Sequence, residues 1–72
     1  MTTAETFAKN LRVLLGLKGV KGQDLANALE LKSSTIYAWT HGECIPGAKT
    51  TDRIAAYFGV TVGTLYAEKI EV

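Results

Sequence analysis

The stretch from Gln23 to Thr40 constrains the fold of this chain more than any other part of it. Its sequence, QDLANALELKSSTIYAWT, predicts two short helices joined by a tight turn. In the first helix, over about residues 23–29, Leu25, Ala26 and Leu29 fall on one face. Helices this short are unstable alone, because nucleation is costly and few hydrogen bonds follow it. The rest of the chain must therefore provide a scaffold for the pair.

The second helix of the pair is predicted to begin near Ser33, whose hydroxyl is expected to accept from the free N-terminal amides. Ile36 and Trp39, three residues apart, form its buried side. The residues predicted to face outward are Ser33, Ser34, Tyr37, Ala38 and His41. Such a pair is typical of a DNA-binding helix-turn-helix, and a corner of two helices that only packs a core is the alternative.

A helix over Thr3–Lys18 is predicted to precede the pair. Thr2 and Glu5 match the S/T-x-x-E capping box at its start, and Gly19 fits a left-handed residue at its end. Lys21 is a poor N-cap residue, so the next helix is expected to begin softly. The apolar stripe of the first helix comprises Phe7, Leu11, Val13, Leu14 and Leu15.

Two more helices are predicted after the pair. The sequence HGECIPG interrupts helical and strand periodicity and is interpreted as a loop. The next segment favours a helix over Ala48–Phe58, and Thr61 is placed to cap a last helix that runs through Tyr66. Ile70 and Val72 are interpreted as a frayed terminus or an interface. The predicted fold class is all-α with five helices.

The composition predicts one folded domain over residues 1–72, with the helix-turn-helix at about 22–41. Hydrophobic residues make up 47% of the chain and charged residues 21%, which is enough apolar material to fold. No apolar run approaches the roughly 18 residues that span a bilayer, and the N-terminus lacks the order of a signal peptide. A cytoplasmic protein without membrane contact is therefore expected.

Thiol and metal chemistry are not expected. Cys44 is the single cysteine, so it forms no internal disulfide, and His41 is the nearest histidine. Together they offer two ligands where a structural zinc site needs about four. A nucleophilic cysteine needs a base positioned in a cleft, and two residues of one loop do not supply it. We expect no metal, no cofactor and no enzymatic activity.

Ten positions carry a resemblance to a known family: Leu25, Ala26, Ile36, Trp39, Gly42, Pro46, Phe58, Gly59, Val60 and Leu65. They fit without an insertion, and over roughly Asn10 to Ala67 the chain resembles the phage Cro and lambda-repressor helix-turn-helix family, also called the Xre family. The resemblance implies a compact five-helix, lambda-repressor-like DNA-binding domain. It implies a small transcription regulator of a phage or mobile-element switch that binds operator DNA. The alternative is an antirepressor that binds a partner repressor through the same face.

The chain departs from this family at three positions. The second helix of such domains often opens with a glutamine that touches the DNA backbone, whereas here Gly22 holds that place and Gln23 follows it. The family often pairs an acid at the end of the third helix with a base in the first. Thr40 and Leu15 stand there instead, so both halves of the ion pair are absent together and no charge is stranded.

The charge around the third helix is balanced. The formal net charge of the chain is +1, and between residues 21 and 53 four basic residues face four acidic ones. Lys21, Lys32 and Lys49 are expected to reach phosphates, and with about three contacts per monomer useful DNA affinity needs a homodimer or a partner protein. The residues predicted to bind DNA or a partner are Gln23, Lys32, Ser33, Ser34, Tyr37, Ala38, His41 and Lys49.

Overall fold

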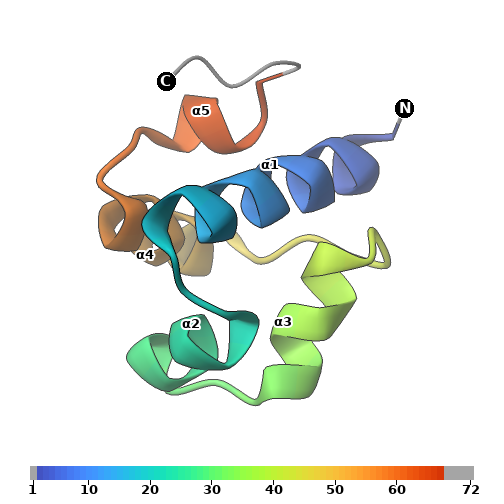
Figure 1. The fold of residues 1–72 in the computed structure, drawn as a ribbon. Coiled ribbons are helices and arrows are strands. Elements are labelled where there is room, and N and C mark those ends of the chain that lie inside the picture. The colour runs from blue at the N-terminus through green and yellow to red at the C-terminus, as the bar shows by residue number, and fades with distance from the viewer. Residues whose placement is uncertain (1, 68–72) are drawn as a thin grey trace.

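The computed structural model describes residues 2–67, and these residues contain five helices and no strand. The helices are α1 (Thr3–Lys18), α2 (Gly22–Leu29), α3 (Ser33–Thr40), α4 (Ala48–Phe58) and α5 (Val62–Leu65). In Figure 1, α1 crosses the centre of the molecule, with α5 on one side and the α2–α3 pair on the other. The predicted all-α, five-helix fold is confirmed. Ile70 and Val72 lie outside the described residues.

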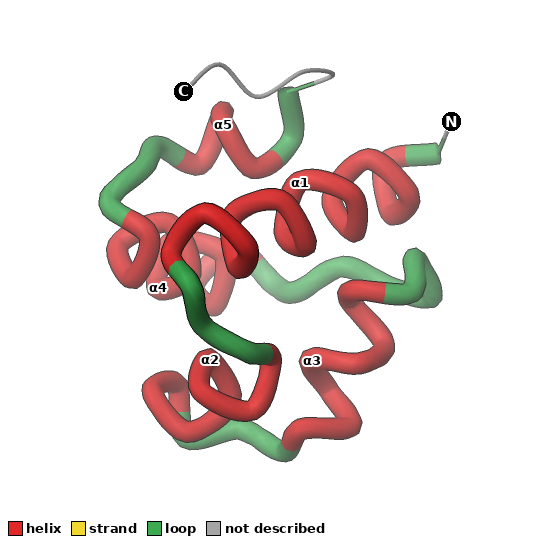
Figure 2. Tube along the Cα trace, in the orientation of Figure 1, coloured by secondary structure: helices red, strands yellow, loops and turns green. Residues whose placement is uncertain are grey.

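The tight turn between α2 and α3 is visible in Figure 2, as is the longer loop over residues 41–47 that leads from α3 to α4. The buried apolar residues form one cluster to which all five helices contribute. Ile36 and Trp39 are buried, as predicted. The Trp39 ring meets that of Phe7 edge-on, with centroids 6.4 Å apart. The cluster consists of Phe7, Leu11, Leu14, Leu15, Leu25, Ala26, Leu29, Ile36, Trp39, Ile54, Ala55 and Leu65.

Val13 does not belong to this core, contrary to the predicted stripe, because 40% of it is exposed. It lies two residues from both Leu11 and Leu15. At 3.6 residues per turn, two residues correspond to about 200° around the helix, so Val13 faces away from both. The predicted apolar stripe is therefore wrong at Val13.

The start of α1 has the predicted capping box. The Thr2 hydroxyl accepts from the Glu5 N–H at 3.2 Å, and the Glu5 carboxylate accepts from the Thr2 N–H at 3.2 Å. Gly19 ends α1 in the left-handed region at φ 73°, also as predicted. At the start of α2, the Asp24 carboxylate accepts from the Lys21 N–H at 2.9 Å. The expectation of a soft start overlooked this acid three residues into the helix.

The predicted cap at Ser33 is wrong. Lys32 is the N-cap residue of α3, with the extended backbone of φ −76° and ψ 143° that this position requires, and no side chain caps the helix. Ser33 is the first residue inside α3, and its hydroxyl is left exposed to solvent. The free amides at this helix start are therefore available to an external acceptor.

Asn10 fastens α5 to α1. It is 1% exposed, and its side-chain amide donates to the carbonyls of Thr64 at 3.3 Å, Leu65 at 2.9 Å and Ala67 at 2.7 Å. At the start of α5, Thr61 accepts from the Thr64 N–H at 3.3 Å, as predicted. The helix ends at Leu65, one residue earlier than expected. A helix of four residues is held at both of its ends by side chains.

Arg53 connects α4 to the end of α2. Its guanidinium, projecting from α4, donates to the Leu29 carbonyl at the end of α2 at 3.1 Å. The last carbonyls of a helix lack partners within the helix, and a cation is favoured there by the helix dipole. This contact engages one nitrogen of the guanidinium, and Arg53 remains exposed at the surface.

Candidate functional site

The outward side of α3 carries a strip of side chains, called the α3 strip, which consists of Ser33, Ser34, Tyr37, Ala38 and His41. Ser33, Ser34, Tyr37 and His41 are exposed, as predicted, and Tyr37 is 59% exposed. Ala38, also predicted to face outward, is less exposed than the others: it is half-buried, at the edge of the strip. The opposite side of α3 is buried in the core. The strip therefore presents two serine hydroxyls at the start of the helix and two aromatic rings at its end.

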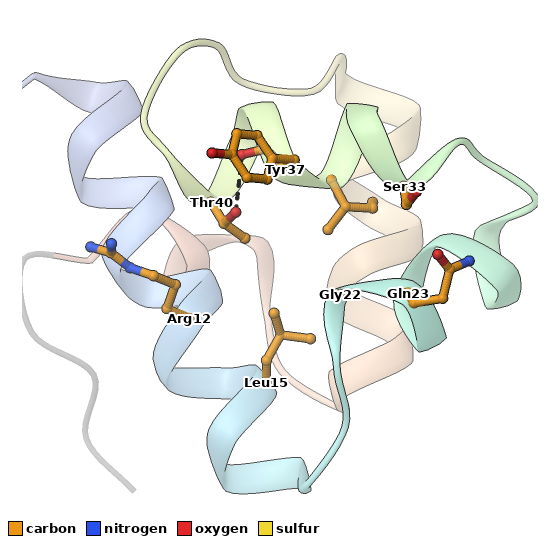
Figure 3. A pocket seen from close by; sticks show the side chains of 8 residues that line it. Arg12, Leu15, Gly22, Gln23, Ser33, Tyr37 and Thr40 are labelled. Carbon is orange, nitrogen blue, oxygen red and sulfur yellow. Dashed lines mark hydrogen bonds between the residues drawn. The ribbon is translucent and has the colours of Figure 1, made fainter.

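The two aromatic rings are stacked on each other. The centroids of the Tyr37 and His41 rings are 3.7 Å apart, and the ring planes are inclined by 19°. His41 Nδ1 lies 2.8 Å from the Tyr37 carbonyl oxygen. The Thr40 hydroxyl donates to that oxygen at 3.0 Å, and Figure 3 marks this bond with a dashed line. The imidazole is thus fixed by a stacking contact and a hydrogen bond, although both rings are exposed to solvent.

A groove of about 370 Å³ opens where α1, the start of α2 and α3 meet (Figure 3). Leu15 and Ile36, both members of the core, form its apolar floor. Gly22 keeps the groove open, since a Cβ at this position would lie 3.2 Å from Ile36 Cγ2. The residues that line the groove are Arg12, Leu15, Gly22, Gln23, Ser33, Ile36, Tyr37 and Thr40.

The groove brings together three of the predicted site residues: Gln23, Ser33 and Tyr37. The Gln23 amide nitrogen also donates to the Asn27 side chain at 2.9 Å on the exposed side of α2. Ser34 and Ala38 belong to the α3 strip but do not line the groove. The groove is therefore the place where the α2 start and the α3 strip converge.

The remaining predicted residues lie around the groove. Lys32 is exposed at the start of α3, and Lys49 is exposed in the first turn of α4. Neither lysine lines the groove. His41 lines a second hollow of about 230 Å³, next to the first one. The lining of this hollow consists of Glu5, Ala8, Arg12, Thr40, His41 and Gly42.

Arg12 is the functional candidate that the sequence analysis missed. It is exposed on α1 and lines both hollows, in one of them as the only charged residue of the lining. The charge count considered only residues 21–53 and so omitted it. A signal was present, because Arg12 lies three residues before Leu15 and therefore on a neighbouring helical face. Arg12 makes the groove more basic than predicted, whereas in the second hollow Glu5 offsets its charge.

Glu5 is the acidic residue in the lining of the second hollow. The pKa of Glu5 is lowered, first by the hydrogen bond from the Thr2 N–H and then by the Thr2 hydroxyl, so this group is a carboxylate.

Within residues 2–67, no three histidine, cysteine, aspartate or glutamate side chains gather where a metal ion could bind. None of the described helices is long and apolar enough to cross a membrane.

Comparison with protein families gives a match. A family model described as a Cro/C1-type helix-turn-helix DNA-binding domain matches residues 10–67. This range includes the whole α2–α3 pair and the α3 strip. Neither the curated proteins nor the solved structures that were compared with the chain match it.

Proposed function

We propose, from the premise that this chain belongs to the Cro/C1-type helix-turn-helix DNA-binding domain family, that it is a small transcription regulator of a phage or mobile-element switch. It acts in the cytoplasm by binding double-stranded operator DNA through α3, and no catalytic step is involved. The observation that carries this proposal is the α3 strip, which leaves its polar residues exposed while Ile36 and Trp39 anchor the opposite side.

The DNA contacts follow from the way in which a recognition helix enters the major groove. Its N-terminal residues contact base edges, so Ser33 and Ser34 are placed to do so. A serine hydroxyl donates or accepts with several bases and makes no bidentate pair, so these two residues discriminate weakly between sequences. Tyr37, one turn further along, is the large group that can add apolar contact and some preference. Ala38 can touch a thymine methyl at the edge of the strip.

The phosphate contacts come from a small number of cations. We propose that Lys32, Lys49 and Arg12 contact the backbone, with Gln23 at the start of α2 as a neutral donor. Plotted against log salt, log K falls, and each contact adds about 0.9 to the steepness of this fall, which is the salt slope. Few contacts per monomer give weak binding, so we propose that a homodimer binds two half-sites one helical turn apart.

A second function is favoured by the groove itself. Its apolar floor and the exposed Tyr37 are suited to an apolar side chain of another protein, since buried aromatics and apolar anchors dominate protein interfaces. On this alternative the chain is an antirepressor that binds a partner repressor through its helix-turn-helix face. Gln23, Ser33 and Tyr37 line the groove and also belong to the DNA-binding set, so the two ligands would compete.

Three substitutions separate the two functions. Lys32→Ala and Lys49→Ala each weaken binding to all DNA sequences about equally if the ligand is DNA, and each lowers the salt slope by about 0.9. Tyr37→Ala then changes sequence preference. If the ligand is a repressor, Tyr37→Ala costs on the order of 2 kcal/mol in affinity and each lysine substitution much less. Lys9→Ala, exposed on α1 and outside both hollows, is the control.

The probes are a DNA duplex selected by the protein from a random-sequence library and a repressor encoded by a neighbouring gene. Binding is measured by fluorescence anisotropy, with each probe alone and with both together. Binding of the selected duplex at micromolar or lower concentration, in physiological salt and without a second protein, supports the operator function. No DNA binding above the non-specific level, together with tight repressor binding that Tyr37→Ala abolishes, refutes it and supports the alternative.

A further inference from the structure

We propose that two copies of this chain associate by inserting Ile45 of one copy into the groove of the other, where Glu43 of the first copy pairs with Arg12 of the second. The groove is the hollow of about 370 Å³ between α1, the start of α2 and α3. Two exposed side chains of the loop over residues 41–47 and the lining of the groove carry this inference. Its consequence for DNA rests on the function proposed above, whereas the self-association itself does not.

The lining of the groove decides which chemistry it accepts. Arg12 is the only charged residue among the described residues that line it, and a guanidinium stays charged in proteins. The floor beside it is apolar, because Leu15 and Ile36 belong to the core. Since no acidic residue of the described lining opposes Arg12, the groove favours an apolar side chain that has a carboxylate next to it.

The loop over residues 41–47, which leads from α3 to α4 in Figure 2, carries such a pair of side chains. Ile45 is 44% exposed, and Glu43 is exposed two residues before it. Pro46, the next residue, is buried and anchors the loop on the domain. Covering Ile45 removes apolar surface from water, which favours association. The protein therefore offers on its own surface the kind of ligand that its groove accepts.

The spacing of the two side chains matches the spacing of the two features in the groove. Arg12 and Leu15 are three residues apart on α1, which separates their Cβ atoms by about 5–6 Å. Glu43 and Ile45 are two residues apart, and two residues of chain span at most about 7 Å. One loop can therefore place its carboxylate at the cation and its isoleucine over the apolar floor at the same time.

The groove and the loop are neighbours on the surface of the domain. Thr40 ends α3 and lines the groove, and the loop begins at the next residue, His41. A two-fold arrangement therefore lets each copy give one loop and receive the other. Such an interface is closed, because the same surface of both copies is used and no third copy is bound.

This self-association competes with DNA on the proposed function. The groove is lined by Gln23, Ser33 and Tyr37, all of which belong to the proposed DNA-binding set. A loop in the groove covers them, so this pair of copies is distinct from the homodimer that binds two half-sites. The protein free to bind DNA then grows more slowly than the total protein as its concentration rises.

The first test measures mass without DNA, by sedimentation equilibrium from about 10 μM to about 1 mM, the range of a weak contact. The wild type should rise from 7.7 kDa towards twice that mass. Arg12→Glu and Glu43→Arg should each weaken association at least about fivefold, because a pair of opposite charges becomes a pair of like charges. The double variant that exchanges the two charges should regain association. Circular dichroism checks that every variant is folded.

The apolar half of the contact has a matched control. Ile45→Ser should weaken association about tenfold, since a buried isoleucine is replaced by a small polar residue. Leu17→Ser should leave association unchanged, because Leu17 is 57% exposed on α1 but is outside the lining of the groove. A wild type that stays at 7.7 kDa throughout contradicts the proposal, and so does association that Leu17→Ser abolishes and Ile45→Ser leaves intact. Neither result bears on DNA binding.

The second test adds the duplex selected by the protein from a random-sequence library. At protein concentrations well below the association range, the wild type and Ile45→Ser should bind it equally. Within that range, the wild type should bind less of the duplex than Ile45→Ser does. Equal binding at both concentrations shows that self-association leaves the α3 strip free, which refutes the competition. If neither protein binds the duplex, the proposed function fails, and the mass measurements still decide the self-association.

Discussion

Asn10 is the residue whose substitution should reveal most about how this small fold is held together. Its amide donates to three carbonyls at and beyond the end of α5, at 2.9, 2.7 and 3.3 Å, from a position that is 1% exposed. The amide has two N–H groups, so the three distances correspond to two full bonds at most. Each intramolecular hydrogen bond contributes about 0.5–1.5 kcal/mol net, and more when its loss strands a buried partner.

Asn10→Ala should therefore reduce the free energy of unfolding by about 2–3 kcal/mol. In a domain of this size each kcal/mol lowers Tm by about 4–8 °C, so Tm should fall by about 10–20 °C. Asn10→Asp preserves the shape but replaces the donor with an acceptor that faces three carbonyls. At neutral pH it should be at least as destabilising as the alanine variant. Since only the protonated carboxyl can donate, its stability relative to the alanine variant should improve towards pH 4.

Thermal and urea unfolding, followed by circular dichroism, measure both variants. Asn27→Ala is the matched control, because that asparagine is exposed and its side chain accepts from the Gln23 amide at 2.9 Å. It should change the free energy of unfolding by less than about 0.5 kcal/mol. An Asn10→Ala protein that melts within a few degrees of the wild type would show that the amide clamp does not stabilise α5.

Trp39→Ala should cost about 3–5 kcal/mol because the ring is 4% exposed within the core, and a thermal melt close to that of the wild type would contradict this. The pKa of Glu5 is lowered in the folded protein, so its carboxylate stabilises the fold at pH values above the pKa of the unfolded chain, and this stabilisation is lost as the pH falls through the folded pKa. In urea unfolding, the difference in the free energy of unfolding between wild type and Glu5→Gln should therefore narrow from neutral pH to about pH 3. Arg12→Gln should lower the salt slope of DNA binding by about 0.9, whereas Lys9→Gln, outside both hollows, should leave it unchanged.

Much of the fold follows from local signals in the sequence. The capping box of Thr2 and Glu5, the left-handed Gly19, and the buried spacing of Ile36 and Trp39 all appear in the structure as predicted. These signals succeed because each depends on residues within about one turn of one another. The start of α3 shows the limit of these signals. Serine is preferred at the N-cap position, which predicted Ser33 there, but Lys32 occupies it.

The contacts between distant parts of the chain were not predictable in the same way. Asn10 meets carbonyls more than fifty residues away, and Arg53 reaches the Leu29 carbonyl from α4. Neither residue type specifies such a partner, since asparagine and arginine are mostly exposed and solvated. The same holds for Arg12, whose place beside Thr40 depends on how α1 packs against α3. The charge count over residues 21–53 left Arg12 out, and the bond of Arg53 to the Leu29 carbonyl was not predicted.

The groove and the core share residues, which decides how function can be probed in this protein. Ile36 and Leu15 are buried members of the core and also the floor of the groove. A side chain at Gly22 would press on Ile36 at 3.2 Å, so filling the groove also disturbs the core. Substitutions of the floor will therefore change stability and binding together. Tyr37 and Arg12, which are exposed at the rim, can be changed without removing a buried contact, and binding should be read from them.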